Sequence, residues 1–381
     1  MGWTKYKIED IIKKCVYGSM PKQECIVAEG YPIFSGYRYS GYYNKYNIKD
    51  RTIIVVARGV GGTGDVRIAP AKCFLTNLSI ALDLKEEIVD IDFLYFYLNQ
   101  QGLRYLDSGA AQSQITISNL QKHIVFLPDL PIQQKIASIL STYDNLIENN
   151  TKRIKLLEQM AENLYKEWFV RFRFPGHENT PMENGLPKGW KKVVASSIID
   201  VMSGGTPKTE YEEFYGGTIP FYTPKDAGDS IFVYRTITNI TDEGLAHCNS
   251  QLYPKGALMI TARGTVGKLS ILGVPMAMNQ SCFALQLKTK DNPYYLYYTM
   301  KEEVARLKKM ANGGVFDTIV VKTFDHIKVL FPSDKMLVLF SNAVSPILDQ
   351  IKALTQQNAN LTRQRDLLLP RLMSGKLEVT P

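Results

Sequence analysis

Two long stretches of the chain carry apolar side chains at alternating spacings of four and three residues. In the first stretch the series is Ile136, Leu140, Tyr143, Ile147, Asn150, Ile154, Leu157, Ala161, Leu164 and Trp168, and in the second it is Phe340, Val344, Ile347, Ile351, Leu354, Asn358, Leu361, Arg365, Leu368 and Leu372. A period of three and a half residues is typical of a long helix that pairs with another helix. The spacing therefore predicts two long helices that pair with each other.

The polar members of each series indicate how the two helices pair. If the helices are antiparallel with their ends matched, Asn150 faces Asn358 and Arg365 faces Tyr143. Parallel pairing would place Asn358 against Ile154, and a buried amide opposite an apolar residue lacks hydrogen-bond partners. Two facing Asn side chains can satisfy each other and fix the register. We therefore predict an intramolecular antiparallel coiled coil; the alternative is two independent amphipathic helices.

The segment before the second helix repeats the segment before the first. The matching pairs are Gly18-Ser19-Met20-Pro21-Lys22 with Gly204-Gly205-Thr206-Pro207-Lys208, Ala57-Arg58-Gly59 with Ala262-Arg263-Gly264, Asn77 and Ser79 with Asn279 and Ser281, and 108–128 with 312–332. Each Ala-Arg-Gly ends a β-branched or apolar run, a pattern typical of a strand that enters a glycine turn. An internal repeat of this length predicts two β-rich modules of like design.

The fold class that these patterns predict is α+β, with two similar β-rich modules joined by the two helices in a pseudo-twofold internal repeat. The predicted segments are a first module at 1–130, a first long helix with its exit at 131–174, a linker at 175–186, a second module at 187–332, a second long helix at 333–376, and a tail at 377–381.

The composition favours a globular protein with a polyanionic partner. The chain has 381 residues, of which 45% are hydrophobic, and its net charge is +8. A positive balance of this kind suits nucleic acid. The N-terminal stretch has no apolar core of the signal-peptide type, and no apolar run approaches the roughly 18 residues that span a bilayer. We therefore expect a cytoplasmic protein with no membrane association.

Candidate catalytic motifs have simpler structural interpretations. Residues 59–64 match G-x-G-x-x-G, but 65–70 is typical of a returning strand, whereas a dinucleotide site needs a helix there. Asn292-Pro293-Tyr294-Tyr295 is better interpreted as the start of a helix. The four His and five Cys residues lack metal-ligand spacing. The sequence therefore predicts no catalytic residue, no metal site and no cofactor on this chain.

Basic and aromatic residues are interleaved in the loops of both modules, a mixture that can bind phosphates and contact base edges. The candidate DNA-binding residues are Lys22, Arg38, Tyr39, Lys45, Arg58, Arg67, Gln112, Lys208, Tyr222, Lys225, Arg263 and Lys268.

Several motifs, taken in order, resemble the specificity (S) subunits of type I restriction-modification enzymes. The motifs are Leu127-Pro128-Asp129-Leu130-Pro131-Ile132-Gln133-Gln134-Lys135-Ile136, Leu164-Tyr165-Lys166-Glu167-Trp168-Phe169-Val170-Arg171-Phe172, Leu186-Pro187-Lys188-Gly189-Trp190, Ile219-Pro220-Phe221-Tyr222-Thr223-Pro224-Lys225, and the closing Gln364-Arg365-Asp366-Leu367-Leu368-Leu369-Pro370-Arg371-Leu372-Met373-Ser374-Gly375. The resemblance covers nearly the whole chain. The entry to the second helix, Phe331-Pro332-Ser333-Asp334-Lys335, lacks the Pro and Gln residues of the first entry.

The resemblance implies a division of labour. Each module would be a target recognition domain that reads one half of a bipartite, asymmetric site in double-stranded DNA. The helices would set the distance between the half-sites and dock two modification (M) subunits. S-adenosylmethionine, Mg²⁺ and ATP would be held by partner subunits, including the restriction (R) subunits, so this chain would be a non-catalytic specificity subunit.

Two other classes of protein provide alternatives. The chain could be a non-catalytic coiled-coil scaffold, or the specificity module of another multisubunit methyltransferase. A single-chain methyltransferase or nuclease would need a cofactor loop and a catalytic motif, which the sequence lacks.

Overall fold

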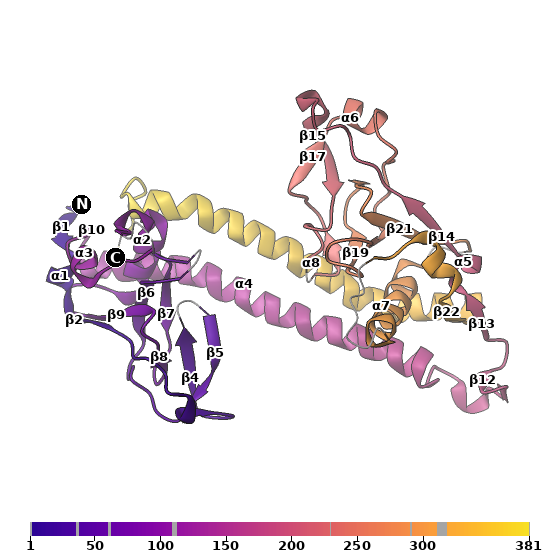
Figure 1. Cartoon of the computed structure of the whole chain (residues 1–381), viewed down its shortest axis with the longest axis horizontal. Coiled ribbons are helices and arrows are strands. Elements are labelled where there is room, and N and C mark those ends of the chain that lie inside the picture. Colours follow the sequence, from indigo (N-terminus) through magenta and orange to yellow (C-terminus); the bar gives the residue numbers. More distant parts are fainter. Residues whose placement is uncertain are drawn as a thin grey trace. The chain divides into compact units, whose positions relative to one another are not determined.

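The computed structural model describes residues 2–35, 38–59, 62–108, 113–228, 230–289, 292–310 and 318–380. The chain forms two compact units (Figure 1), one made of Met1–Thr151 with Gln356–Pro381 and the other of Lys152–Thr355. We call them unit 1 and unit 2 and describe each by itself. The unit boundaries lie inside both long helices, so the domain limits drawn at the helix ends stay a prediction.

The first module of the repeat lies in unit 1. Its elements are β1 (Thr4–Lys7), α1 (Ile8–Ile11), β2 (Ile12–Tyr17), β3 (Ile26–Val27), β4 (Tyr31–Ser35), β5 (Arg38–Tyr43), β6 (Thr52–Val56), β7 (Val66–Ala69), β8 (Phe74–Leu75), β9 (Ser79–Leu84), α2 (Ile91–Gln101), α3 (Ile117–Gln121) and β10 (Ile124–Leu127), with 3-10 turns at Gln23–Cys25 and Arg104–Leu106. They form sheets of order β2-β9-β6-β7, β3-β5-β4-β8 and β1-β10.

The central strand β6 is buried on both faces. Ile53 and Val55 pack into the core beside α2, whereas Ile54 packs into a second core with Leu75 and Ala81. A strand with both faces buried has a continuous apolar run instead of an alternating one. This explains why the run before Arg58 contains no polar residue.

The second module lies in unit 2. Its elements are β13 (Lys191–Val194), α5 (Ala195–Ile198), β14 (Ile199–Ser203), β15 (Tyr215–Tyr222), β16 (Phe232–Val233), β17 (Thr238–Ile240), α6 (Asp242–Ala246), β18 (Leu258–Thr261), β19 (Leu269–Leu272), β20 (Ala277–Met278), β21 (Cys282–Leu287), α7 (Pro293–Met310) and β22 (Lys328–Phe331), with 3-10 turns at Glu212–Phe214 and Val321–Asp325. The sheets have the orders β14-β21-β18-β19-β16, β17-β15-β20 and β13-β22.

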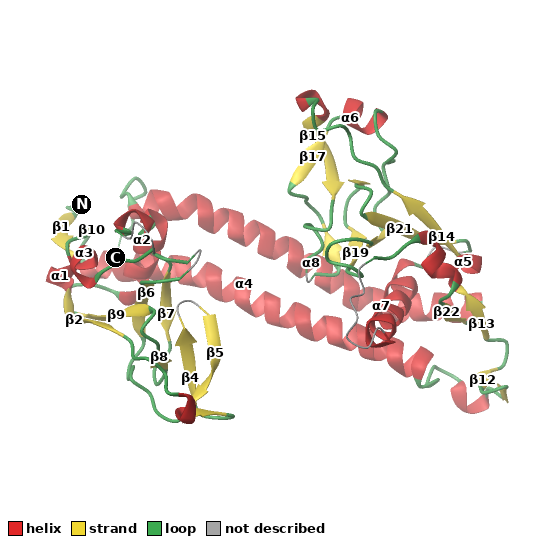
Figure 2. Cartoon of the chain, in the orientation of Figure 1, coloured by secondary structure: helices red, strands yellow, loops and turns green. Residues whose placement is uncertain are grey.

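The two modules share one sheet topology, as the internal repeat predicts. The order β2-β9-β6-β7 corresponds to β14-β21-β18-β19, and the pair β1-β10 corresponds to β13-β22. In each module the strands are joined mostly by loops (Figure 2). Val125 pairs with Tyr6, and Val329 pairs with Val193, in the same two places. The repeat in the sequence is therefore a repeat of structure.

One part of the sequence alignment is wrong by one residue. Val56 pairs with Ser79, and its counterpart Thr261 pairs with Cys282. Ser79 therefore corresponds to Cys282 and not to Ser281. The loops before β9 and β21 both have three residues, but the Asn-x-Ser pattern that they share occurs one position earlier in the second loop, so matching the pattern shifts the alignment.

Two interpretations from the sequence, a strand that returns after residues 59–64 and a helix that begins near Asn292, are confirmed. Strands β6 and β7 pair antiparallel, with Val55 opposite Val66, so the G-x-G-x-x-G segment connects a hairpin. Helix α7 begins at Pro293, and the backbone N–H of Tyr295 donates to Asn292 Oδ1 at 3.0 Å. Asn292 is thus an N-cap.

The long helices are α4 (Leu130–Tyr165), which continues as a π-helical turn at Lys166–Val170, and α8 (Asp334–Met373). In unit 1, Asn150 is 5% exposed and its Nδ2 donates to Asn358 Oδ1 at 3.0 Å and to Gln357 Oε1 at 3.1 Å. The Nδ2 of Asn358 donates to the Ile147 carbonyl at 3.4 Å and to Thr151 Oγ1 at 3.3 Å. The two amides face each other, as the 4,3 spacing predicts.

A second polar layer in unit 1 defines the direction of the helices. Arg365, which the antiparallel register places opposite the half-buried Tyr143, donates from Nη1 to Asp144 Oδ1 at 2.6 Å. Residue numbers fall along α4 from Asn150 to Asp144 while they rise along α8 from Asn358 to Arg365. The pairing is therefore antiparallel.

In unit 2 the helices pack through an aromatic cluster. The ring of Phe340 on α8 contacts Tyr165 and Trp168, with centroids 6.1 and 5.7 Å apart. Trp168 and Phe340 obey the same register as Asn150 and Asn358. Trp190, at the start of the second module, stacks on Phe174 at 4.9 Å. The second module thus shares a core with both helices.

A short hairpin lies between α4 and the second module. Strands β11 (Met182–Glu183) and β12 (Leu186–Pro187) pair antiparallel around Asn184 and Gly185. Both turn residues have positive φ, 51° and 76°. Asn-Gly is the preferred sequence for such a two-residue turn.

Candidate nucleic-acid interface

In the first module, Arg58 lies at the end of β6 in a turn whose backbone is fixed by three hydrogen bonds. The N–H groups of Ala57 and Arg58 both donate to the Leu78 carbonyl, at 2.9 and 3.2 Å, and the Ala57 carbonyl accepts from the Ile115 N–H at 2.9 Å. The guanidinium carbon of Arg58 lies 5.9 Å from the centre of the Tyr17 ring. The Arg58 side chain is exposed. We call Ala57–Gly59 and its counterpart the arginine turns.

The second module builds the same turn around Arg263. The N–H groups of Ala262 and Arg263 donate to the Ser281 carbonyl at 2.7 and 3.3 Å, and the Ile319 N–H donates to the Ala262 carbonyl at 2.9 Å. Arg263 is exposed as well. Each module therefore holds one arginine on a rigid strand end with its side chain in solvent.

A glycine loop, Gly18–Lys22 in the first module and Gly204–Lys208 in the second, lies against β8 or β20 respectively. A Cβ at Gly18 would lie 2.3 Å from the Leu75 carbonyl oxygen, and a Cβ at Gly204 would lie 2.4 Å from the Met278 carbonyl oxygen. Only glycine permits such a close approach of two backbones. The close contact, with hydrogen bonds from the Ser19 N–H to the Leu75 carbonyl at 2.9 Å and from the Gly205 N–H to the Met278 carbonyl at 3.1 Å, anchors the start of each glycine loop.

Most of the candidate DNA-binding residues lie on the surface. The exposed side chains are Lys22, Lys45, Arg58, Arg67, Lys208, Lys225 and Arg263, and Lys268 is half-buried. Arg38 and Tyr39 belong to β5, but their side chains lie outside the described part of the structure, as does the whole of Gln112.

Tyr222 is the exception, and its placement corrects that assignment. The ring is fully buried in a core with Met259 and Met278, and the hydroxyl donates to Ser270 Oγ at 3.0 Å. Burial raises the pKa of Tyr222 above its usual range. Its neighbours Pro220 and Lys225 suggest a surface loop, but the side chain is part of the fold and cannot contact DNA directly.

The exposed cations have only weak intramolecular partners. Arg67 lies 3.9 Å from Asp65, and Lys208 lies 3.5 Å from Glu210. Ion pairs between exposed side chains contribute at most about 1 kcal/mol. Both cations can therefore exchange their carboxylate for a phosphate.

A hollow of about 290 Å³ in unit 2 adds two lysines that the sequence did not indicate. It is lined by Gly228, Ser230, Gly267, Lys268, Leu269, Tyr297, Lys301, Val304, Ala305 and Lys308. Lys301 and Lys308 come from α7 and lie beside the β18–β19 turn. Lys301 also pairs with Glu162 at 2.6 Å. Basic residues on one face of a helix are a signal that could have identified them.

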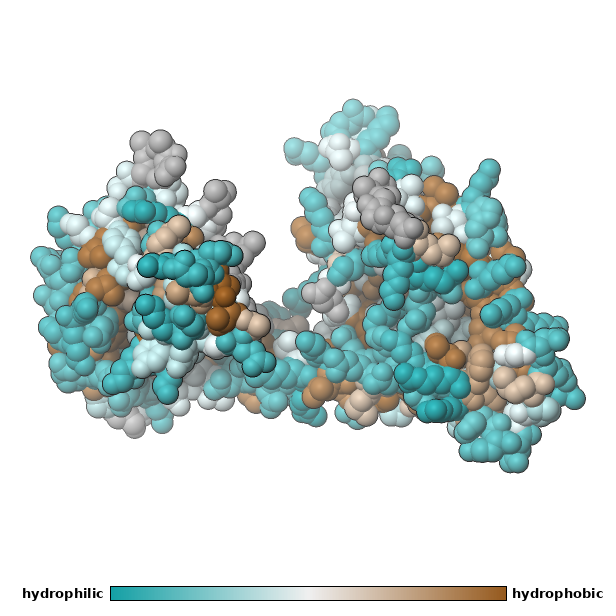
Figure 3. Space-filling model, turned by 60° about the horizontal axis from the view of Figure 1, so that its bottom comes forward, coloured by the Kyte–Doolittle hydropathy of each residue, from teal (hydrophilic) through white to brown (hydrophobic). Residues whose placement is uncertain are grey.

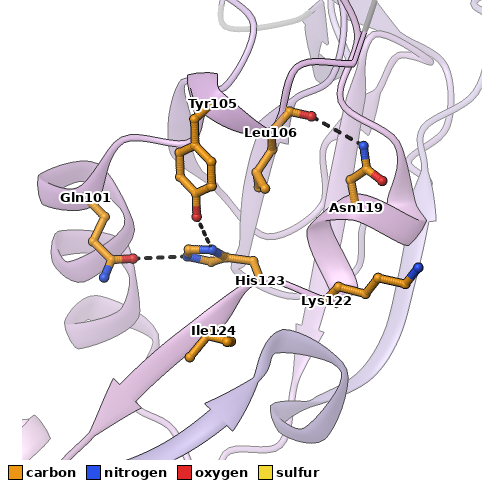
Figure 4. Close-up of a pocket in the computed structure, with 7 residues that line it drawn as sticks. All are labelled: Gln101, Tyr105, Leu106, Asn119, Lys122, His123 and Ile124. Atoms are coloured by element: carbon orange, nitrogen blue, oxygen red, sulfur yellow. Dashed lines mark hydrogen bonds between the residues drawn. The ribbon is translucent and has the colours of Figure 1, made fainter.

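A larger hollow, of about 610 Å³, lies in unit 1 (Figure 4). The His123 ring lies between two side chains: Tyr105 donates to Nδ1, and Nε2 donates to Gln101 Oε1 at 3.0 Å. Burial lowers the pKa of His123. Gln101 Nε2 in turn donates to the Tyr97 hydroxyl at 2.9 Å, and that hydroxyl accepts from the Phe126 N–H at 3.0 Å, so this chain of hydrogen bonds ties α2, the Arg104–Leu106 turn and β10 together.

The remaining surface is largely hydrophilic on the face shown in Figure 3, and hydrophobic residues are exposed there in patches. Among the described residues, no group of three or more His, Cys, Asp or Glu side chains is arranged to hold a metal ion. In the same part of the chain, no helix has the length and apolar character that crossing a bilayer requires.

Comparison with known proteins gives a consistent result. The family of the type I restriction modification DNA specificity domain matches residues 1–159 and 187–363. The HindI specificity subunit of Haemophilus influenzae is 24% identical over 326 residues, which cover 69% of this chain and 71% of that protein. The MjaVIII specificity subunit of Methanocaldococcus jannaschii is 22% identical over 402 residues, which cover 99% of this chain and 93% of that protein.

A solved structure shares the fold. The type I restriction-modification S subunit from M. genitalium matches with a TM-score of 0.69 at 21% identity, covering 100% of this chain and 97% of that one. The residues that match the family, 1–159 and 187–363, include both arginine turns, both glycine loops and most of α4 and α8. This chain therefore belongs to the family of type I restriction-modification DNA specificity domains.

Proposed function

We propose that this chain is the DNA-specificity subunit of a type I restriction-modification complex, and that each module reads one half of a bipartite, asymmetric site in double-stranded DNA. The observation that carries the proposal is the repeated arginine turn. Arg58 and Arg263 occupy the same place in two modules of one topology, while the surrounding side chains differ. Two modules with the same fold but different side chains around the arginine turn are expected to read two different half-sites.

The charge distribution supports contact with the DNA backbone. The chain carries a net charge of +8. Lys268, Lys301 and Lys308 line one hollow. Lysine and arginine contacts to phosphates position a protein on DNA, and base contacts then specify the sequence. We assign the lysine hollow to positioning and the arginine turns to base contact.

The helices provide surface for partner subunits. Leu156 and Met160 lie one turn apart on α4 and are 59% and 55% exposed, and Leu367 on α8 is 62% exposed. Apolar side chains that neither helix buries are typical of a surface that another protein covers. We propose that two modification subunits dock on the helices, one in each unit, and that the helices set the spacing of the half-sites.

The chemistry of the complex would then reside on the partners. S-adenosylmethionine, Mg²⁺ and ATP would bind the modification and restriction subunits, and the complex would act in the cytoplasm, where it meets DNA. This chain would contribute recognition alone.

The decisive experiment is a methylome of cells that carry the cognate modification gene, with and without this gene. The proposal expects a split adenine-methylated motif that disappears when this gene is deleted. An unchanged methylome, together with DNA binding by the purified chain that does not depend on salt, would favour a coiled-coil scaffold. If the chain neutralises Z phosphates, a plot of the logarithm of the DNA-binding constant against the logarithm of salt concentration has a slope of about −0.9Z.

A further inference from the structure

The repeat allows the surroundings of the two arginine turns to be compared residue by residue. With the register of the strands, Asn77 corresponds to Gln280, and Met20 corresponds to Thr206. Asn77 and Gln280 each precede the residue whose carbonyl holds the arginine turn, namely Leu78 and Ser281. Each module therefore has a carboxamide residue next to the backbone carbonyl that holds its arginine turn.

We propose that Gln280 reads an adenine in the half-site of the second module, an inference that rests on the proposed function. A Gln or Asn carboxamide can accept from N6 and donate to N7 of adenine in the major groove, a pairing that no other base permits in both hydrogen bonds. Gln280 is exposed, and no described residue accepts a hydrogen bond from its Nε2. The donor that this pairing needs is therefore available.

The Gln280 side chain is held in place before DNA arrives. Its Oε1 accepts a hydrogen bond from Thr206 Oγ1. Thr206 is itself fixed because the neighbouring Gly205 N–H donates to the Met278 carbonyl at 3.1 Å. On the other side, the Ser281 N–H donates to Asn279 Oδ1 at 3.1 Å. One lone pair of Oε1 remains for the adenine amino group.

The first module lacks this support. Met20 stands where Thr206 stands, is 73% exposed and has no hydroxyl to hold a carboxamide. The shorter side chain of Asn77 is also less exposed than that of Gln280. A preorganised contact loses less entropy on binding. The second module therefore discriminates more strongly at this position than the first module does.

The test uses the complete complex in cells and reads the methylated motif for variants of this chain. Gln280→Leu should make one A·T position of the second half-site degenerate, with a roughly 5- to 150-fold loss of discrimination there. Gln280→Glu should shift that position towards C·G, because a carboxylate accepts from cytosine N4. Thr206→Val should keep the preferred base but reduce discrimination. The first half-site should not change.

Gln286→Leu is the matched control, because Gln286 is an exposed carboxamide on β21, the strand that follows the loop of Gln280. It should leave the motif unchanged. An unaltered motif with Gln280→Leu would refute the assignment of Gln280 while leaving the proposed function intact. Loss of all methylation from a Gln280→Leu chain with a normal melting curve would also overturn it. If the unmodified chain directs no motif at all, the proposed function itself fails.

Discussion

Replacing the two facing amides of the coiled coil tests the helix pairing most directly. The change is made in steps, with Asn150→Leu alone, Asn358→Leu alone and the double variant. Asn150 is nearly buried and makes two side-chain hydrogen bonds across the seam. Comparing the unfolding free energies of the single and double variants shows whether each amide depends on the other for its hydrogen bonds.

The magnitudes follow from the contacts. Asn150→Leu removes two hydrogen bonds, each contributing about 0.5–1.5 kcal/mol, and leaves Asn358 without its donor, which costs about 1–2 kcal/mol at a half-buried site. A buried Leu side chain returns about 1.5–3 kcal/mol. We expect the single variant to lose about 1 kcal/mol of unfolding free energy. The double variant leaves no unpaired amide at the seam and should gain about 1–2 kcal/mol.

Thermal unfolding of the full chain measures these differences. For a unit of 150–250 residues, 1 kcal/mol shifts Tm by about 2–4 °C. Asn149→Leu, at an exposed position on the same helix, serves as the control and should stay within about 0.5 kcal/mol of the unmodified chain. The reasoning is refuted if Asn150→Leu alone is as stable as the double variant, or if the double variant melts below the unmodified chain.

Three further outcomes are expected. Burial lowers the pKa of His123 in the folded chain. The unfolding free energy should therefore fall as the pH drops below about 6.5, the pKa of an unfolded His, and then through the lower folded pKa. His123→Asn should remove this part of the pH dependence of Tm between pH 5 and 7.5, and an unchanged slope would contradict the assignment. Gly204→Ala places a Cβ 2.4 Å from a carbonyl oxygen, so DNA binding in a salt titration should weaken, whereas unchanged affinity would show that the loop can move. Leu156→Glu with Met160→Glu changes only the surface in unit 2, so it should lower the number of co-purified modification subunits from two to one without lowering Tm; retention of both would place docking elsewhere.

The elements whose pattern depends only on the order of residues along the chain could be predicted from the sequence. Asn150 and Asn358 stand out because a helical seam has a fixed period, and the direction of pairing follows from the chemistry of two amides. The arginine turns stand out because a buried strand must end where its apolar run ends. Both rules use only the order of residues.

The placements that depend on packing between distant segments could not be predicted. Tyr222 has surface-like neighbours in the sequence, but β19 and β20 close over its ring. The sequence can show that Lys301 and Lys308 share one face of α7, but it cannot show that this face lies against the β18–β19 turn and so brings the two lysines to Lys268. The correspondence of Asn77 with Gln280 required strand register, since the Asn-x-Ser pattern in the two loops is shifted by one position and aligns Asn77 with Asn279 instead.

Unit 1 contains segments from both ends of the sequence, and this affects the order in which the chain can fold. Leu372 and Met373 of α8 are buried in the core of the first module, and Leu377 and Val379 pack against it. Unit 2 is one continuous segment, so it can fold while synthesis continues. At roughly 5–20 residues per second, the about 200 residues of unit 2 take about 10–40 s to emerge. The module that is synthesised first is therefore the one whose core is completed last, and a ribosome that stops before Leu372 leaves the N-terminal half without its final packing.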